Sequence, residues 1–292
     1  MTRTLLALML LTAAAPVRGE EDRGFLYVNE LGDAERGEGG PRRALHATAL
    51  LGLETAGYFR GLFDDAPEDL DVLQSGPSLR LTLRLPEGLG LRGPTLTVGS
   101  GNNFWTDQPI PAPEGGPWFE SDNFIGAAAE LAPGWRGALT YTAYLSPNGA
   151  SPEFQELAAA LRRTEDVFGL ALAPQLKAAF RTENGEGLFL QASAAASTPA
   201  FGLGAREVAL AFPVEVGVGL GGYYGEGNDG EGYATLGAVA STPLANGPLG
   251  TWTLAAKAVA LARTDALAAL DPPAADGDPV VIWGGLSLGF AY

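Results

Sequence analysis

Alternation of apolar and polar residues along most of the chain is the feature that most constrains its fold. In residues 78–85, leucines occupy positions 79, 81, 83 and 85, while Arg80, Thr82 and Arg84 occupy the positions between them. Residues 208–220 repeat the pattern, with valine, leucine or phenylalanine at every even position. A period of two is typical of a β-strand with one apolar face, and helical spacing is hard to find. The chain is therefore predicted to be all-β.

The same rule divides residues 44–292 into segments of strand character separated by turn residues. The twelve predicted strands cover residues 44–60, 77–85, 95–100, 120–132, 135–145, 154–164, 172–181, 188–198, 208–221, 232–244, 250–263 and 280–292. An even number of strands of about ten residues is what a closed bacterial outer-membrane barrel requires. No stretch of residues 20–292 is long and uncharged enough for a membrane-spanning helix. We therefore predict a closed antiparallel transmembrane β-barrel of twelve strands.

The connections between these strands differ in length and charge according to the end of the barrel on which they fall. If the first strand runs outward, the outer connections are residues 61–76, 101–119, 146–153, 182–187, 222–231 and 264–279. The inner connections are residues 86–94, 133–134, 165–171, 199–207 and 245–249. The outer set is longer, and it carries 17 of the 34 acidic residues and no Lys or Arg. Long outer loops and short periplasmic turns are typical of outer-membrane barrels, so this asymmetry supports the topology.

The N-terminal residues predict export. Arg3 precedes the apolar run 5–15, and the small residues Val17 and Gly19 favour cleavage before Glu20. These are the features of a secretory signal peptide covering residues 1–19, and the apolar run is too short to span a bilayer. Residues 20–43 precede the barrel with mixed charge and many glycines. This segment is expected to form either a periplasmic leader or a plug that enters the lumen.

The C-terminal strand alternates strictly and stops on an aromatic residue. Its apolar positions include Leu286, Leu288, Phe290 and Tyr292. The pattern resembles the last strand of outer-membrane β-barrels, which implies that these residues are an assembly signal for the barrel-assembly machinery. An edge strand that ends a secreted β-sandwich is the alternative interpretation. Aromatic pairs also fall near predicted outer strand ends, where barrels carry aromatic girdles. These are Phe104 with Trp105, Trp118 with Phe119, and Tyr223 with Tyr224, together with Trp283.

Two stretches resemble the TorF family of porins. Residues 57–61 (GYFRG), followed by an aspartate-rich loop and residues 76–79, are similar to the opening hairpin of that family. Residues 118–124, then Trp135, Tyr141 and Tyr144, then residues 146–148, resemble its central strands. The resemblance covers residues 44–165, and the proline-rich loop 106–117 departs from it. It implies a barrel in the outer membrane of a Gram-negative bacterium.

Strand parity places many charged residues inside the predicted barrel. The basic candidates for lining a pore are Arg60, Arg80, Arg84, Arg162, Lys177, Arg181, Lys257 and Arg263. The acidic positions with inward parity are Glu54, Glu156 and Glu215, together with Glu120, Asp122 and Glu130. These charges can pair across the lumen, because an uncompensated buried charge is costly. Alternatively, some of the bases stay hydrated and guide anionic solutes.

The first outer loop carries a cluster of acids. Its members are Asp64, Asp65, Glu68, Asp69 and Asp71. Such a run is either a hydrated surface or a place where carboxylates collect divalent cations such as Ca²⁺ or Mg²⁺. The cluster does not match the calcium loop of an EF-hand, so no specific metal site is predicted.

Composition excludes several classes of function. The chain has no cysteine and a single histidine, which excludes thiolate metal sites and two-histidine metal sites. A formal charge of −16 argues against nucleic acid as a partner. His46 lies near the periplasmic start of the first strand, the wrong end for a barrel hydrolase. Neither enzymatic activity nor a cofactor is expected.

The prediction is a porin-like channel for passive diffusion of small hydrophilic solutes, charged ones included, through the outer membrane. Its other partners are membrane lipid, the assembly machinery and divalent cations at the acidic loops. The alternatives are a non-conducting structural or surface-interaction barrel, a secreted β-sandwich and a barrel hydrolase.

Overall fold

The computed structural model describes most of the chain from residue 44 onward. The described residues are 44–63, 74–87, 90–105, 116–149, 152–164, 172–183, 187–198, 200–204, 206–271 and 277–292. The predicted signal peptide (1–19) and the segment 20–43 lie outside them. The acidic loop residues Asp64, Asp65, Glu68, Asp69 and Asp71 also lie outside, so the expectations attached to them stay predictions.

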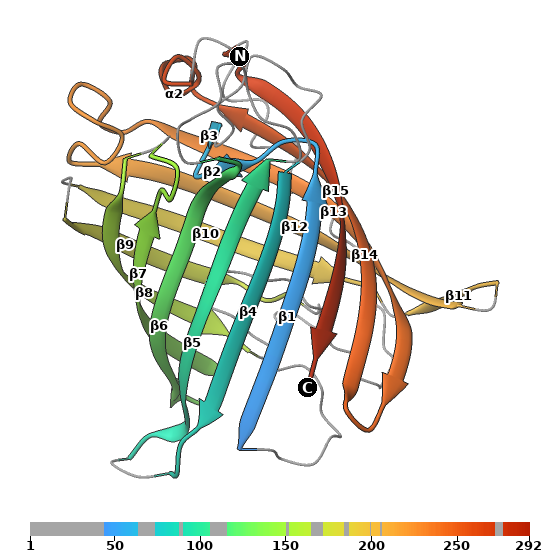
Figure 1. Ribbon diagram of the computed structural model, residues 1–292. Helices are drawn as coiled ribbons and strands as arrows, with labels where there is room; N and C mark the ends of the chain where they lie inside the picture. The colour runs from blue at the N-terminus through green and yellow to red at the C-terminus, as the bar shows by residue number, and fades with distance from the viewer. Residues whose placement is uncertain are drawn as a thin grey trace.

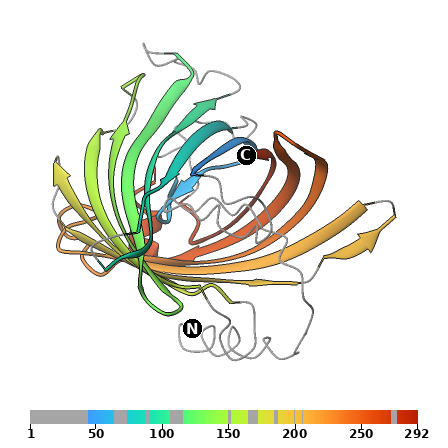
Figure 2. The same ribbon diagram turned by 90° about the horizontal axis from the view of Figure 1, so that it is seen from below.

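Twelve long antiparallel strands close into a barrel, which confirms the predicted fold class (Figure 1). The strands are β1 (Leu45–Glu54), β4 (Gln74–Arg84), β5 (Arg92–Trp105), β6 (Trp118–Ala132), β7 (Trp135–Leu145), β8 (Phe154–Arg163), β9 (Gln175–Glu183), β10 (Leu188–Ser197), β12 (Arg206–Leu220), β13 (Gly232–Gly247), β14 (Gly250–Arg263) and β15 (Val280–Ala291). Each pairs with its neighbours in sequence order. Pairing of β10 with β12 and of β1 with β15 completes the ring, which Figure 2 shows from below. The short strand β11 (Phe201–Leu203) pairs with the start of β12.

The barrel surface is apolar on the outside, because every second residue of each strand points away from the lumen. Leu79 on β4 is 52% exposed, Ile125 on β6 is 48% exposed and Ile282 on β15 is 75% exposed. Closure satisfies the backbone hydrogen bonds between strands, and the apolar belt suits a hydrocarbon environment. The described residues include no helix of the length and apolar character needed to cross a membrane.

Strand bounds agree closely with the alternation pattern in the middle of the chain. The predicted segments 135–145 and 250–263 coincide with β7 and β14. The segment 95–100 was too short, because β5 begins at Arg92 and continues past residue 100 through Gly101 and two asparagines to Trp105. Small and polar residues interrupt the apolar alternation there, and β5 stays paired with β4 and β6 despite a register shift between Asn103 and Phe104.

The prediction that the first strand continues to residue 60 was wrong. The strand β1 ends at Glu54, and the chain then folds into the barrel as a hairpin of β2 (Tyr58–Phe59) and β3 (Leu62–Phe63) (Figure 2). Arg60 has a φ of 53° and Gly61 a φ of 82°, the pair of positive values that a tight two-residue hairpin turn requires. Gly61 is also needed for space, because a Cβ there would lie 2.8 Å from the Tyr233 ring. Arg60 therefore belongs to an outer connection that enters the lumen.

An apolar cluster fills part of the lumen at the end toward which β1 runs, here called the outer end. Its buried members, which we call the plug core, are Ala158, Ala179, Phe189, Tyr223, Tyr224, Tyr233, Leu261 and Leu267. Tyr58 and Leu62 of the hairpin pack against it, as does Trp283. Leu267 comes from the short helix α2 (Asp265–Ala268), whose first turn is capped by the hydroxyl of Thr264. The hairpin therefore lies against the wall formed by β8 to β15.

Candidate functional site

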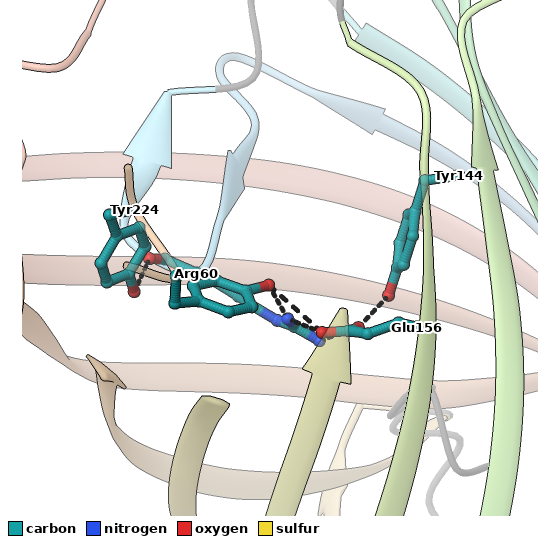
Figure 3. Close-up of polar contacts among 5 residues, drawn as sticks. Arg60, Tyr144, Glu156 and Tyr224 are labelled. Carbon is teal, nitrogen blue, oxygen red and sulfur yellow. Dashed lines mark hydrogen bonds and ion pairs between the residues drawn. The ribbon is translucent and has the colours of Figure 1, made fainter. Parts of the chain in front are cut away.

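Arg60 at the hairpin tip is the centre of a buried polar cluster at the outer end of the lumen. Its guanidinium makes a bidentate contact with the carboxylate of Glu156 on β8, and Nη2 lies 2.5 Å from Oε2 (Figure 3). The same carboxylate accepts hydrogen bonds from the hydroxyls of Tyr144 and Tyr223, each at 3.2 Å. Tyr224 donates its hydroxyl to the Arg60 carbonyl at 2.9 Å. These five residues, the Arg60 cluster, tie the hairpin to the opposite wall.

Aromatic rings enclose the Arg60 guanidinium. Its Cζ lies 4.4 Å from the centre of the Phe189 ring and 4.7 Å from that of Phe59. The side chains of Arg60 and Glu156 are only 3% and 2% exposed. Burial lowers the pKa of Arg60, but Tyr144 and Glu156 raise it, and the net shift is upward. The arginine therefore stays charged, and the buried pair is balanced in charge and in hydrogen bonds, as such a pair must be to persist.

A second arginine holds the other side of the hairpin turn. Arg263 at the end of β14 donates from Nη1 to the carbonyl of Gly61 at 2.8 Å and to Oδ1 of Asp271 at the same distance. It also donates to the carbonyl of Asp278, and its Cζ lies 5.5 Å from the Tyr58 ring. The hairpin is therefore held by the side chain of its own Arg60, which contacts Glu156, and by Arg263 of the wall, which contacts the hairpin turn.

The remaining inward charges of the outer half also lie close to partners. Lys257 on β14 forms an ion pair with Glu54 on β1 at 2.6 Å. Glu215 on β12 accepts hydrogen bonds from Gln191 at 2.7 Å and from Tyr233. Arg181 on β9 stacks over the rings of Phe154 and Tyr223.

Other candidate pore residues lie elsewhere on the inner face. Lys177 is buried on β9, at 6% exposure. Arg162 is half-buried near the far end of β8, and Arg84 is exposed as the last residue of β4. Glu120 accepts a hydrogen bond from Asn103, and Glu130 pairs in register with Arg92 and Arg136.

The lumen is partly empty beside the wall formed by β1 and β4 to β7, whereas the plug core fills it beside the opposite wall. A cavity of about 140 Å³ lies there. It is lined by Thr48, Ala49, Leu50, Ser78, Leu79, Arg80, Gly101, Asp122, Phe124, Thr142 and Tyr144. Tyr144 belongs to both regions, since it also contacts Glu156 and packs 5.2 Å from the Phe59 ring of the hairpin. The cavity therefore borders the Arg60 cluster directly.

Two inward-facing glycines of β5 shape this cavity. A Cβ at Gly99 would lie 2.3 Å from the Phe124 ring, so only glycine lets that ring lie against the wall. The Arg80 guanidinium lies 5.2 Å from the same ring. At Gly101 the nearest atom to such a Cβ is the Asp122 Cβ, at 4.0 Å. The space over Gly101 is open, and it forms part of the cavity.

The aromatic pairs do not all form a girdle. Tyr223 and Tyr224 are 1% and 7% exposed and point into the plug core, which corrects their assignment to the membrane interface. Trp105 and Phe119 are also buried, with rings stacked 4.7 Å apart, whereas Trp118 is 39% exposed. The sequence signal of a tight turn here is the set of glycines that flank the two tyrosines. Gly221, Gly222 and Gly225 all have positive φ.

The C-terminal residues lie on the outer surface of β15. Leu286 is 57% exposed and Tyr292 is 43% exposed, while Leu288 and Phe290 are half-buried. The Phe290 ring packs 4.9 Å from that of Trp252 on β14. Among the described residues, no group of three or more histidines and acids is arranged to hold a metal ion.

Two solved structures of outer-membrane proteins are weakly similar to the chain. No family model matches the chain, and no curated protein does either. An outer membrane channel from Pseudomonas putida F1 is 11% identical with a TM-score of 0.46, covering 89% of this chain and 100% of that one. OprB from Pseudomonas putida is 8% identical with a TM-score of 0.37, covering 85% and 94%.

Proposed function

We propose that this barrel is a narrow channel for passive diffusion of small hydrophilic solutes across the bacterial outer membrane. The observation that carries the proposal is the cavity beside the hairpin, because the hairpin and the plug core leave that part of the lumen unfilled. The apolar exterior provides the surface for membrane lipid. The exposed alternating residues of β15 suit an assembly signal, and the likeness to TorF-family porins stays part of this proposal.

Charge along the free side supports passage of charged solutes as well as neutral ones. Arg80 lines the cavity itself, and Arg84 lies on the same strand nearer its end. Ionised groups in a narrow lumen raise the local concentration of ions of opposite charge. Acidic outer loops would raise the local concentration of cations at the mouth. Salt weakens this effect, because dissolved ions screen charges beyond a Debye length of about 10 Å at 0.1 M ionic strength.

Single-channel recording of the refolded full chain in planar bilayers tests the proposal. Conductance steps of reproducible size are expected, and the reversal potential in a salt gradient reports which ion sign is preferred. Protein that is shown independently to be folded and inserted but remains electrically silent would overturn the channel.

A non-conducting structural or surface-interaction barrel is the second candidate. Its support is the plug core, which fills the outer end of the lumen between β8 and β15. In that case the Arg60 cluster would serve only to stabilise the barrel. Silence in the recording, followed by continued silence after the cluster is broken, would favour this candidate.

A barrel hydrolase finds less support in the residue arrangement. His46 lies opposite Thr82 in the β1–β4 register, near the end of the barrel away from the Arg60 cluster. Thr48, two residues along β1, is paired in register with Arg80. A nucleophile–histidine–acid arrangement needs a hydroxyl beside the imidazole and an acid behind it.

A further inference from the structure

We infer that the outer surface of β5 and β6 carries a contact site for a second copy of this chain, so that two barrels pair in the membrane about a two-fold axis. These strands lie side by side in the wall nearest the viewer in Figure 1. The site is a block of four polar side chains, here called the polar island: Ser100, Asn102, Ser121 and Asn123. The inference concerns assembly, so it goes beyond the proposed function and does not depend on conduction.

Strand parity places the polar island on the membrane side of the wall. Side chains alternate between the two faces of a strand, so the two members on β5 point to the same side as the exposed Val98. The two members on β6 point to the same side as the exposed Ile125. The register pairs Ser100 with Asn123, and Asn102 with Ser121. The four side chains therefore form a two-by-two block that faces outward.

Apolar side chains border the polar island along both strands and on the neighbouring strands. The exposed Leu79 is the partner of Ser100 on β4, and the exposed Leu145 is the partner of Ser121 on β7. Toward the outer end of the strands, the rings of Phe104 and Trp118 stack with their centres 5.9 Å apart. Aromatic girdles mark the interfaces of outer-membrane barrels, so this pair places the island on the hydrocarbon side of the interface.

The amides of the polar island use only part of their hydrogen-bonding capacity. Asn102 donates to the Ser100 hydroxyl at 3.2 Å, and Asn123 donates to the Ser121 hydroxyl at 3.1 Å. A side-chain amide has two N–H donors and an oxygen with two lone pairs. Within the part of the chain that the structure describes, no residue donates a hydrogen bond to the amide oxygen of either asparagine. Such an oxygen is costly in hydrocarbon, where water cannot serve as a partner.

Other polar side chains on the same surface are satisfied within one barrel. Tyr141 on β7 donates to Gln155 on β8, and Gln155 donates to Glu183 on β9. This chain of hydrogen bonds gives each of the three groups a partner. The polar island has no such neighbour on β7, because its members there face Ala143 and Leu145.

A second copy of the chain supplies the partners that the island lacks. An amide carries both donors and an acceptor, so two amides related by a two-fold axis can hydrogen bond reciprocally. A closed assembly built from a single surface patch requires this symmetry, because both chains then use the same patch. Serine and asparagine side chains are known to bridge neighbouring transmembrane segments, and small residues let the backbones approach. Lipid acyl chains offer neither donors nor acceptors.

Light scattering of the refolded full chain in mild detergent measures the pairing. We expect the mass of two protomers. Asn102→Leu combined with Asn123→Leu removes both amides, and it should raise the dissociation constant of the pair at least about tenfold, which is about 1.4 kcal/mol. Thr242→Leu is the matched control. It makes the same change from polar to apolar on β13, beside the exposed Leu254, and should leave the constant unchanged.

A pair that persists in the double variant would place the contact elsewhere and overturn the inference. A mass of three protomers would overturn the two-fold axis. The double variant has to be folded for the comparison, which is checked by its circular dichroism spectrum and by its heat-dependent migration in gels.

Crosslinking in liposomes tests the same contact without detergent and with the amides in place. The chain has no cysteine, so Ser100→Cys introduces a single reactive thiol. Packed sheet faces lie about 10 Å apart, so a bismaleimide of about that span should link two copies. Val216→Cys, at an exposed position of β12 on the far wall, is the control and should not link. Absence of the link in Ser100→Cys, or equal linking of both variants, would overturn the inference.

Discussion

The two sides of the lumen use inward-facing glycines in opposite ways. On the filled side, a Cβ at Gly217 would lie 2.6 Å from the Tyr233 ring and 2.7 Å from the Phe189 ring, so aromatic side chains cover this glycine completely. On the hollow side, Phe124 covers Gly99 in the same manner, but Gly101 stays open. A glycine therefore leaves room above the wall, and that room stays open where no neighbouring ring covers it.

The charges follow the same division. On the filled side, Arg60 and Glu156 saturate each other and the surrounding tyrosines. On the hollow side, Arg80 and Asp122 border a cavity. Close packing of charged groups stabilises the plug, whereas the charged groups on the hollow side border a space that protein atoms do not fill.

Breaking the Arg60 cluster should have the largest effect. Arg60→Ala leaves the Glu156 carboxylate buried without its cation, which costs about 3–5 kcal/mol when one partner of a buried pair is removed. The hairpin should leave the wall, so the single-channel conductance should rise severalfold and the urea midpoint of unfolding should fall. Arg84→Ala is the control for stability, since Arg84 is exposed and its loss should leave the midpoint unchanged. Unchanged conductance in Arg60→Ala would mean that the hairpin does not limit the channel.

The glycine comparison can be sharpened with one matched pair of substitutions. Gly217→Ala puts a methyl group against Tyr233 and Phe189 and should destabilise the barrel by about 1–3 kcal/mol, the usual cost of overpacking. Gly101→Ala places the same methyl group in open space and should change stability very little. Unfolding titrations of the two variants in the same detergent give the comparison. Equal destabilisation would contradict the difference between the two sides.

Selectivity should respond to Arg80 more than to Arg84. Arg80→Gln removes a positive charge from the cavity wall, so the reversal potential in a salt gradient should shift toward cation preference. Arg84→Gln should shift it less, because the exposed Arg84 is screened by solvent ions. An equal shift in both variants, or none in either, would remove Arg80 from the conducting path.

The smallest expected effect concerns Tyr224. Burial raises the pKa of Tyr224, so the folded barrel retains that phenolic proton at a pH where the unfolded chain loses it. The free energy of unfolding should therefore fall as pH rises above about 10, the usual pKa of tyrosine. Tyr224→Phe should cost about 1 kcal/mol at neutral pH through loss of one hydrogen bond, and it should make the alkaline decline less steep. An unchanged alkaline slope would exclude Tyr224 as a contributor.

The sequence by itself determined the barrel. Strand number, strand order and the outward face of β4, β7 and β14 follow from an alternation that each segment carries within itself. A membrane barrel imposes that pattern locally, since every lipid-facing position must be apolar whatever the rest of the chain does. The alternation weakens from Gly101 to Asn103, and there the predicted bounds of β5 were too narrow.

Only the tertiary structure decided what fills the lumen. Arg60 contacts Glu156 and Tyr223, which lie 96 and 163 positions further along the chain. Arg263 contacts Gly61 of the hairpin turn, which is 202 positions away. The hairpin and the two tyrosines lie in connections, where no lipid face imposes a period on the sequence. Parity could place Arg80 and Asp122 inside the barrel, but it could not show that they border a cavity. The filling of the lumen depends on contacts between distant segments, and alternation along a strand carries no information about such contacts.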